Sequence, residues 1–274
     1  MSATELQACL ARLYTSWAFR SLFRADPDAA LDGYFLTARE REAISGIDWD
    51  TLDWFAASLK TKRRSRLEKA FPALFAIGGP TLDTYVDRYH EVYPLRPGET
   101  GSDDAAQFGA FIEETLADDE HLPAYARELA RFERTLQEVR RSFRTAGTAA
   151  GDPPPESNGL PTRPEPLPGV LLARFDYNVS EIDDAVREGR EPAPRDEGEV
   201  VVYALREGIR DPRVLRVSEP TAVVIELCDG RRSVDEITLE IEERYGQAGL
   251  RAGIEDAIGQ LVASGILREG DEAA

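Results

Sequence analysis

The chain of 274 residues is long enough for two modest domains, and 42% of its residues are hydrophobic while 31% are charged. This composition allows a packed core and excludes a chain that is disordered throughout. The formal net charge of −18 argues against nucleic-acid binding, because contact with phosphates depends on neutralisation by Lys and Arg.

Residues 1–145 carry the pattern of an all-α domain. Apolar side chains recur every three or four positions across residues 6–23, as they do on one face of a helix, and Thr4 is placed to cap that helix. The same periodicity predicts two longer helices near the end of the region, at residues 102–118 and 122–145.

Local signals divide this region into several helices. Asp26-Pro27 predicts the start of a short helix, because Pro fits a first helical turn. Residues 37–40 have the spacing of a capping box, and either Asp48 or Asp50 is expected to cap the next helix. Gly78-Gly79-Pro80 predicts a strong break.

Residues 146–169 are rich in Pro and Gly and hold few large apolar side chains. Such a segment cannot bury a core of its own, so it is predicted to be a linker. It is expected to separate the helical domain from a second domain at residues 170–269.

The second domain is predicted to combine a sheet with helices. Strands are expected at residues 170–178, 199–205 and 213–218, with a short helix capped by Ser180 between the first two. The later elements are predicted as helices at residues 219–227, 233–245 and 251–264 and a closing strand at Ile266-Leu267. A three-stranded sheet followed by three helices is a winged-helix-like domain, so the fold class expected for the chain is α+β.

Residue types that carry catalysis are sparse. The sequence has two His, His90 near a predicted helix end and His121 in an acidic corner, and it has no phosphate-binding or dinucleotide-binding glycine motif. Asp87, His90 and Glu91 could gather as metal ligands on one helix face, but an exposed helix end is the favoured interpretation. We therefore expect no catalytic residue, no metal site and no cofactor in this chain.

Cysteine usage and hydropathy bear on where the protein works. Cys9 and Cys228 stand far apart in apolar surroundings, so we expect two buried, reduced thiols. No basic segment followed by an apolar run opens the chain, and no stretch reaches the ~18 apolar residues of a membrane-spanning helix. We expect no signal peptide, no membrane contact and a cytoplasmic location.

A basic run at residues 60–66 stands out against the acidic background. On a helix its side chains would point in most directions, so a solvated helix face is the favoured interpretation. A contact surface for an acidic partner is the sharper alternative, and nucleic acid is the least favoured one.

The winged-helix-like region could bind DNA or a peptide. Its helices at residues 233–245 and 251–264 carry many acidic positions, which would face phosphates badly. The strand at residues 213–217 suits the addition of a peptide strand, and Arg213 and Arg216 would attract an acidic peptide. Protection of a sheet edge against aggregation is the alternative explanation for these charges.

The segment from Val214 to Leu267 resembles the PqqD-like recognition element that binds leader peptides of ribosomally synthesised and post-translationally modified peptides (RiPPs). The matching sequences are LRVSEPTAVVIELCDG, RSVDEI, ERYG and IEDAIGQLVASGILRE. The resemblance implies three strands followed by three helices, with the leader docked beside the third strand and the last helix. The chain departs from this pattern at residues 178–198, which insert a helix and a polar loop between the first two strands.

Carried over by position, the resemblance implies a set of peptide-binding residues on one strand and one helix. On the strand they are Arg213, Val214, Leu215, Arg216 and Val217, and on the helix they are Ala257, Ile258, Leu261 and Val262.

The region Phe19–Ile44 is similar to two helical families. One is the small helical subunit of extradiol ring-opening dioxygenases, and the other is the helical domain of partner proteins of multinuclear non-heme iron oxidative enzymes. A helical domain joined to a recognition element looks most like the second family, and within it most like partners from the 3-thiaglutamate (pearlin) pathway. This resemblance implies a heterodimer with a TIM-barrel iron enzyme, which would excise the β-carbon of a peptidyl Cys and would itself hold the iron.

The leading hypothesis is therefore a non-catalytic partner protein that captures a precursor peptide and presents it to an iron enzyme for modification of a Cys. A helical accessory subunit of a ring-opening dioxygenase is the second hypothesis. A winged-helix DNA-binding regulator is the third, and the acidic surface argues against it.

Overall fold

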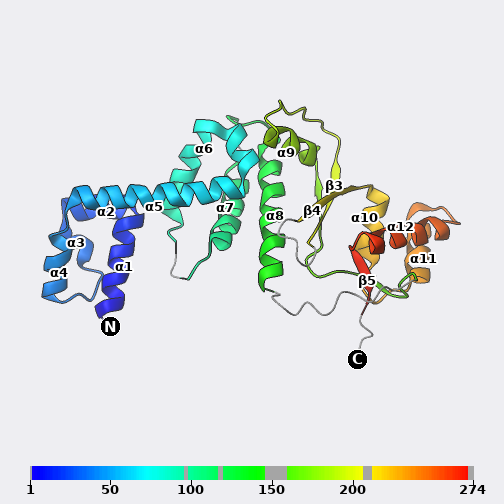
Figure 1. Ribbon diagram of the computed structural model, residues 1–274, viewed down its shortest axis with the longest axis horizontal. Helices are drawn as coiled ribbons and strands as arrows, with labels where there is room; N and C mark the ends of the chain where they lie inside the picture. The colour runs from blue at the N-terminus through cyan, green and yellow to red at the C-terminus, as the bar shows by residue number, and fades with distance from the viewer. Residues whose placement is uncertain (1, 96–97, 117–119, 146–158, 206–211, 271–274) are drawn as a thin grey trace. The chain divides into compact units, whose positions relative to one another are not determined.

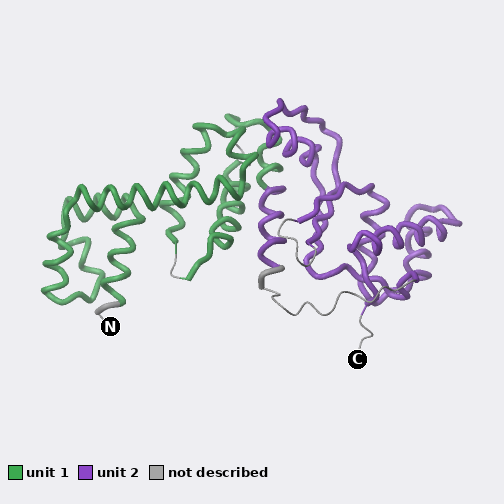
Figure 2. The backbone as a smooth tube through the Cα atoms, viewed as in Figure 1, with its two compact units in different colours: residues 1–130 green, residues 131–274 purple. Residues whose placement is uncertain are grey.

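The computed structural model of the chain describes residues 2–95, 98–116, 120–145, 159–205 and 212–270. The fold is α+β, as predicted: the N-terminal part is helical, and a three-stranded antiparallel sheet with helices follows (Figure 1). The structure divides into two compact units, unit 1 at residues 1–130 and unit 2 at residues 131–274 (Figure 2).

Unit 1 is built from helices. They are α1 (Ser2–Thr15), α2 (Trp17–Ala25), α3 (Pro27–Leu31), α4 (Ala38–Ser45), α5 (Trp49–Ala70), α6 (Pro72–Val92), α7 (Gly101–Thr115) and the start of α8 (Ala126–Thr145). The capping predictions at Asp26 and at the Thr37–Glu40 box are confirmed, and Asp48 is the residue that caps α5.

Two predictions about helix ends in unit 1 are wrong. Thr4 does not cap the first helix, because α1 already begins at Ser2. Residues 6–23 do not form one helix either, because Ser16 takes an extended conformation and caps α2 by accepting a hydrogen bond from the amide of Phe19. The predicted break at Gly78-Gly79-Pro80 is a kink inside α6, where Gly79 has φ 48° and ψ −138°.

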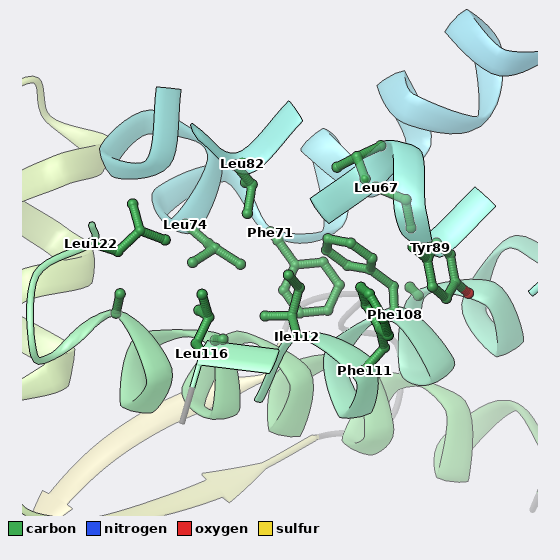
Figure 3. Close-up of a cluster of buried hydrophobic side chains, with 14 residues drawn as sticks. Leu67, Phe71, Leu74, Leu82, Tyr89, Phe108, Phe111, Ile112, Leu116 and Leu122 are labelled. Carbon is green, nitrogen blue, oxygen red and sulfur yellow. The ribbon is translucent and has the colours of Figure 1, made fainter. Parts of the chain in front are cut away.

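Two apolar clusters form the core of unit 1. The first is formed by side chains of the five helices from α1 through α5, and it includes the buried residues Leu13, Phe23 and Leu52. The second joins α5, α6, α7 and the start of α8, and aromatic rings fill its centre (Figure 3). The ring of Phe108 meets that of Phe71 edge-on, with centroids 5.3 Å apart.

A buried ion pair lies at the edge of the second cluster. Arg63 on α5 and Asp104 on α7 are 6% and 2% exposed, and Arg63 Nη2 lies 2.6 Å from Asp104 Oδ1. Arg63 also donates to the carbonyl of Tyr93, and the hydroxyl of Tyr89 donates to Asp104. Arg63 belongs to the basic run at residues 60–66, so the interpretation of that run as a solvated face is wrong at this position.

Unit 2 is a three-stranded sheet with helices on both faces. The strands are β2 (Leu171–Phe175), β3 (Glu199–Ala204) and β4 (Arg213–Val217), paired antiparallel in the order β2-β3-β4. A separate ribbon pairs β1 (Pro164–Pro166) with β5 (Leu267–Glu269). The helices are the later part of α8, α9 (Val179–Arg187), α10 (Glu219–Leu227), α11 (Val234–Tyr245) and α12 (Arg251–Ala263).

Alternation along β3 supplies a core to each face of the sheet, because successive side chains of a strand point to opposite faces. Val202 and Ala204 pack with α10, α11 and α12. Val201 and Tyr203 pack with Phe132, Leu136 and Val139 on the later part of α8 and with Val179 on α9.

Because the later part of α8 packs on this second face of the sheet, the boundary between the units lies before the linker predicted at residues 146–169. The units divide between Ala130 and Arg131, inside α8, because the side chains after that point pack on the sheet. The later part of the predicted linker is ordered as well, since it contains β1. The earlier part, residues 146–158, lies outside the described residues.

The start of α9 also differs from the prediction. Ser180 does not cap this helix, because α9 begins at Val179 after Asn178. The hydroxyl and the amide of Ser180 both donate to the carboxylate of Glu199 on β3. The Ser180 hydroxyl therefore fixes α9 to the sheet and does not satisfy the helix end.

Both thiols are buried, as predicted, and we expect neither to react in the folded protein. Cys9 is 0% and Cys228 is 1% exposed. Burial raises the pKa of Cys9, and it raises the pKa of Cys228 to about 12, so the reactive thiolate is scarce at pH 8. Ellman's reagent should detect two thiols in urea and none in native buffer. Rapid modification of either thiol in native buffer would contradict this burial.

Candidate functional site

The outer edge of β4 is the best candidate for a binding site in unit 2. β4 is an edge strand, and among the described residues no strand lies on its outer side. Alternate residues of an edge strand direct their N–H and C=O groups away from the sheet, which makes them available to another strand. The edge can therefore hold an extended peptide by main-chain hydrogen bonds.

The side chains of β4 divide between the two faces of the sheet. Leu215 and Val217 are half-buried against the core formed with α10, α11 and α12, while Val214 packs on the other face. By alternation, Arg213 shares the face of Leu215 and Val217, and Arg216 shares the face of Val214. Both Arg side chains are exposed.

Arg216 is already engaged within unit 2. Its guanidinium is hydrogen-bonded to the carboxylate of Glu181 on α9, and its Nε lies 3.8 Å from Glu199 Oε1. Hydrogen bonds from Asn178 and Arg216 hold the pKa of Glu181 below its ordinary value. Of the two Arg predicted to attract a peptide, Arg213 is the one without an ion pair to a described residue.

The four predicted residues on α12 do not form one surface. Ile258 and Leu261 are 0% and 5% exposed and belong to the core, so they support the helix and are not free to contact a peptide. Ala257 and Val262 are half-buried and lie about 140° apart around the helix, given about 100° per residue. They flank the buried stripe on opposite sides, so a groove along one side of α12 includes only one of them.

The segment before β1 covers part of the Val262 side of α12. A Cβ atom placed on Gly259 would lie 3.8 Å from the side chain of Leu160. Gly259 lies about 60° from Val262 around the helix, on the side away from Ala257. Leu215 and Val217, half-buried on β4 itself, are therefore the better candidates for apolar contact with a peptide at this edge.

A charged pocket of about 500 Å³ lies at the carboxyl end of β4, and the sequence reasoning missed it. Arg174, Arg195 and Arg216 line it together with several acidic side chains. Arg174 pairs with Glu219 and Glu226 of α10, at 2.8 and 2.6 Å, and its hydrogen bonds lower the pKa of Glu219. Because each of the three Arg is already paired with a carboxylate, we do not take this pocket as an ion-binding site. The strand pairing that gathers them has no local sequence signal.

An open sheet edge beside a helix layer is the arrangement that peptide-binding modules use for strand addition. A family model described as Coenzyme PQQ synthesis protein D (PqqD) matches residues 199–267. The match covers β3, β4, α10, α11, α12 and the start of β5, about a quarter of the chain, and it supports a PqqD-like RiPP recognition element there. None of the curated proteins compared with the chain matches it.

The three residues weighed as metal ligands in unit 1 have other roles. Asp87 pairs with Lys60 at 2.7 Å, and Glu91 accepts hydrogen bonds at the start of α2, including one from the amide of Trp17. His90 is 6% exposed, so its assignment to an exposed helix end is wrong. Over the described part of the chain, no three His, Cys, Asp or Glu residues gather as metal ligands do, and no helix is long and apolar enough to cross a membrane.

Burial of His90 should make stability depend on pH. Burial, followed by the charge of Arg63, lowers the pKa of His90 from 6.5 to about 4. Between these values the unfolded chain binds a proton that the folded chain does not, so stability is lost as the pH falls from 6.5 towards 4. Urea unfolding measures the free energy of unfolding at pH 7 and at pH 4.5. Between these pH values the wild type should lose about 2 kcal/mol more of this free energy than the His90→Leu variant does. Equal losses would contradict a buried neutral His90.

Proposed function

We propose that this chain is a non-catalytic partner protein that binds the leader of a RiPP precursor along the outer edge of β4. The observation that carries the proposal is the open edge of β4 inside the residues that match PqqD. A leader would add as a further strand, and its affinity would come from main-chain hydrogen bonds.

The surroundings of the edge suggest which leaders would fit. Arg213 is exposed beside the edge and shares a face with Leu215 and Val217. A leader with apolar side chains on one face and an acidic residue opposite Arg213 would bury its apolar groups and form an ion pair. Specificity would come from apolar side chains at every second position of the leader, because alternate side chains of an added strand point to the same face of the sheet.

The proposal extends to the enzyme that acts on the bound peptide. Following the resemblance of Phe19–Ile44, we propose that unit 1 docks a TIM-barrel multinuclear non-heme iron enzyme, which holds the iron and modifies a Cys of the precursor. β-Carbon excision, as in 3-thiaglutamate formation, is the modification we favour. The chain would work in the cytoplasm and contribute by positioning the peptide and raising its effective concentration at the enzyme.

The test is a titration of fluorescently labelled precursor peptides encoded beside this chain's gene, with metal-free protein. Binding without metal is expected, since the edge of β4 offers main-chain groups and apolar side chains. The same titration is repeated with the co-encoded enzyme present. No binding in either condition would exclude a leader-binding role, whereas binding without stimulation of the enzyme would exclude the partnership.

A further inference from the structure

Unit 1 contains a second pocket, of about 630 Å³, that the peptide-binding role does not use. We name it the α5 pocket, because about half of its lining residues lie on α5. The others come from the end of α1, the start of α2, the end of α6 and Leu95. Its volume lies in the range of about 300–1,000 Å³ that is typical of small-molecule sites.

The charge of the α5 pocket is opposite to that of the whole chain. Six lining residues are Arg or Lys and three are Asp or Glu, whereas the chain carries a net charge of −18. A cleft with walls of one sign concentrates ligands of the opposite sign. The local excess of positive charge therefore selects an anion.

The acidic groups of the α5 pocket are occupied. Asp87 pairs with Lys60 at 2.7 Å, and Asp53 pairs with Arg24 at 2.7 Å. Glu91 accepts from the hydroxyl of Ser16 and from the amide of Trp17, so the start of α2 already holds a carboxylate.

Three cations of the α5 pocket remain available. Lys62, Arg66 and Arg88 are exposed, and none forms an ion pair with another residue in the part of the chain that the structure describes. Lys62 and Arg66 are four positions apart on α5, so they lie on one face of the helix.

Apolar groups and one unsatisfied polar group complete the α5 pocket. The indole of Trp17 is 67% exposed, and Leu59 and Leu95 add apolar surface. His90 lines the pocket, and both of its ring nitrogens are buried without a hydrogen-bond partner among the described residues. An unsatisfied buried polar group costs about 1–3 kcal/mol, so a ligand that displaces the atoms covering His90 would gain a hydrogen bond there.

We propose that the α5 pocket binds an organic carboxylate with an apolar or aromatic body. The body would stack on Trp17, and the carboxylate would pair with Lys62, Arg66 or Arg88 through charge-assisted hydrogen bonds. A free small acid and a carboxylate-bearing segment of another protein share this chemistry. The pocket lies wholly in unit 1, so this inference is independent of leader binding at β4.

The test uses phenylacetate as the probe, with NMR detection of the Trp indole and His ring nitrogens of the full-length protein. His121 serves as an internal reference, because it does not line the pocket. We expect a Kd on the order of 1 mM. Phenylacetamide, which lacks the charge, and inorganic phosphate, which lacks the apolar body, should bind at least about tenfold more weakly, a loss of about 1.4 kcal/mol.

Charge variants locate the site. Lys62→Glu and Arg88→Glu should each weaken phenylacetate at least about tenfold, and Lys62→Gln and Arg88→Gln should do so to a smaller degree. Lys69→Glu makes the same charge change on α5 outside the pocket and should leave affinity unchanged. N-acetyl-Phe-Asp-amide distinguishes the sources: tighter binding than phenylacetate indicates a protein segment, and weaker binding indicates a free acid. No binding of phenylacetate, equal binding of phenylacetamide, or equal weakening by Lys69→Glu would overturn the proposal.

Discussion

Replacing Asp104 by Ala is expected to lower the free energy of unfolding of unit 1 by about 3–5 kcal/mol, because it leaves the charge of Arg63 buried without its partner. The Nε–H of Arg63 is shared between the two carboxylate oxygens of Asp104, at 3.0 and 3.2 Å, and this carboxylate also accepts from Nη2 of Arg63 and from Tyr89. The hydroxyl of Tyr89 would lose the carboxylate acceptor but keep the main-chain carbonyl of residue 104, which lies 3.0 Å away. Urea unfolding followed by circular dichroism measures the change, provided that the transitions of the two units are resolved.

Two further variants separate the effect of burial from the effect of charge. Asp83→Ala removes one of the two acidic partners of Arg64, the other being Glu68, from a partly exposed pair in which the Asp side chain is 50% exposed, and should cost at most about 1 kcal/mol. Arg63→Met in the Asp104→Ala background should recover part of the lost stability, since removing both charges also removes the desolvation cost. If the double variant were no more stable than Asp104→Ala, the unpaired charge would not be the cause.

Leader binding is expected to depend on main-chain hydrogen bonds at every second residue of the peptide. In an added strand, alternate N–H groups point to β4 and the others point away. Methylation of an inward N–H should cost about 1 kcal/mol, a loss of roughly fivefold in affinity, and methylation of its neighbours should cost much less. A scan of singly N-methylated leaders by fluorescence anisotropy should therefore show a period of two. A loss without that period would exclude strand addition.

The same titration can identify the side chain that attracts the leader. Arg213→Glu should weaken the binding of an acidic leader at least about tenfold, because repulsion replaces attraction. The loss of affinity should be larger at low salt, where the charges are screened less. Arg231→Glu is the matched control, since Arg231 is exposed in the turn between α10 and α11. Arg216 pairs with Glu181 on the other face of the sheet, so Arg216→Ala should change affinity less than Arg213→Ala does.

The sequence predicted well the features of this fold that depend on local signals. The capping boxes at Thr37 and Ser233 are confirmed because each needs residues only three positions apart. The strands at β3 and β4 were found because runs of β-branched residues mark them. The positions carried over at residues 213–217 form an edge strand, β4, and their role in peptide binding stays a prediction.

Features that depend on distant partners could not be predicted in this way. Arg63 stands in a basic run, and its burial depends on Asp104, 41 residues away. The ribbon of β1 with β5 joins Pro164 to Glu269, and a three-residue strand of Pro-Glu-Pro carries no strand signal. On α12, the spacing of Ile258 and Leu261 is the same for residues of a core and for residues of a binding surface. The elements that pack on them decide between the two, and those elements are distant in the chain.

The cover that α8 provides for the sheet limits how the recognition element can be transplanted. A fragment that begins after residue 158 would keep β4 and α12 but would lose Phe132, Leu136 and Val139. The face of the sheet around Tyr203 would then meet water, and bare apolar sheet surface promotes aggregation. A chimera that uses this recognition element for another precursor peptide should therefore begin at or before Arg131, so that it includes the part of α8 that covers the sheet.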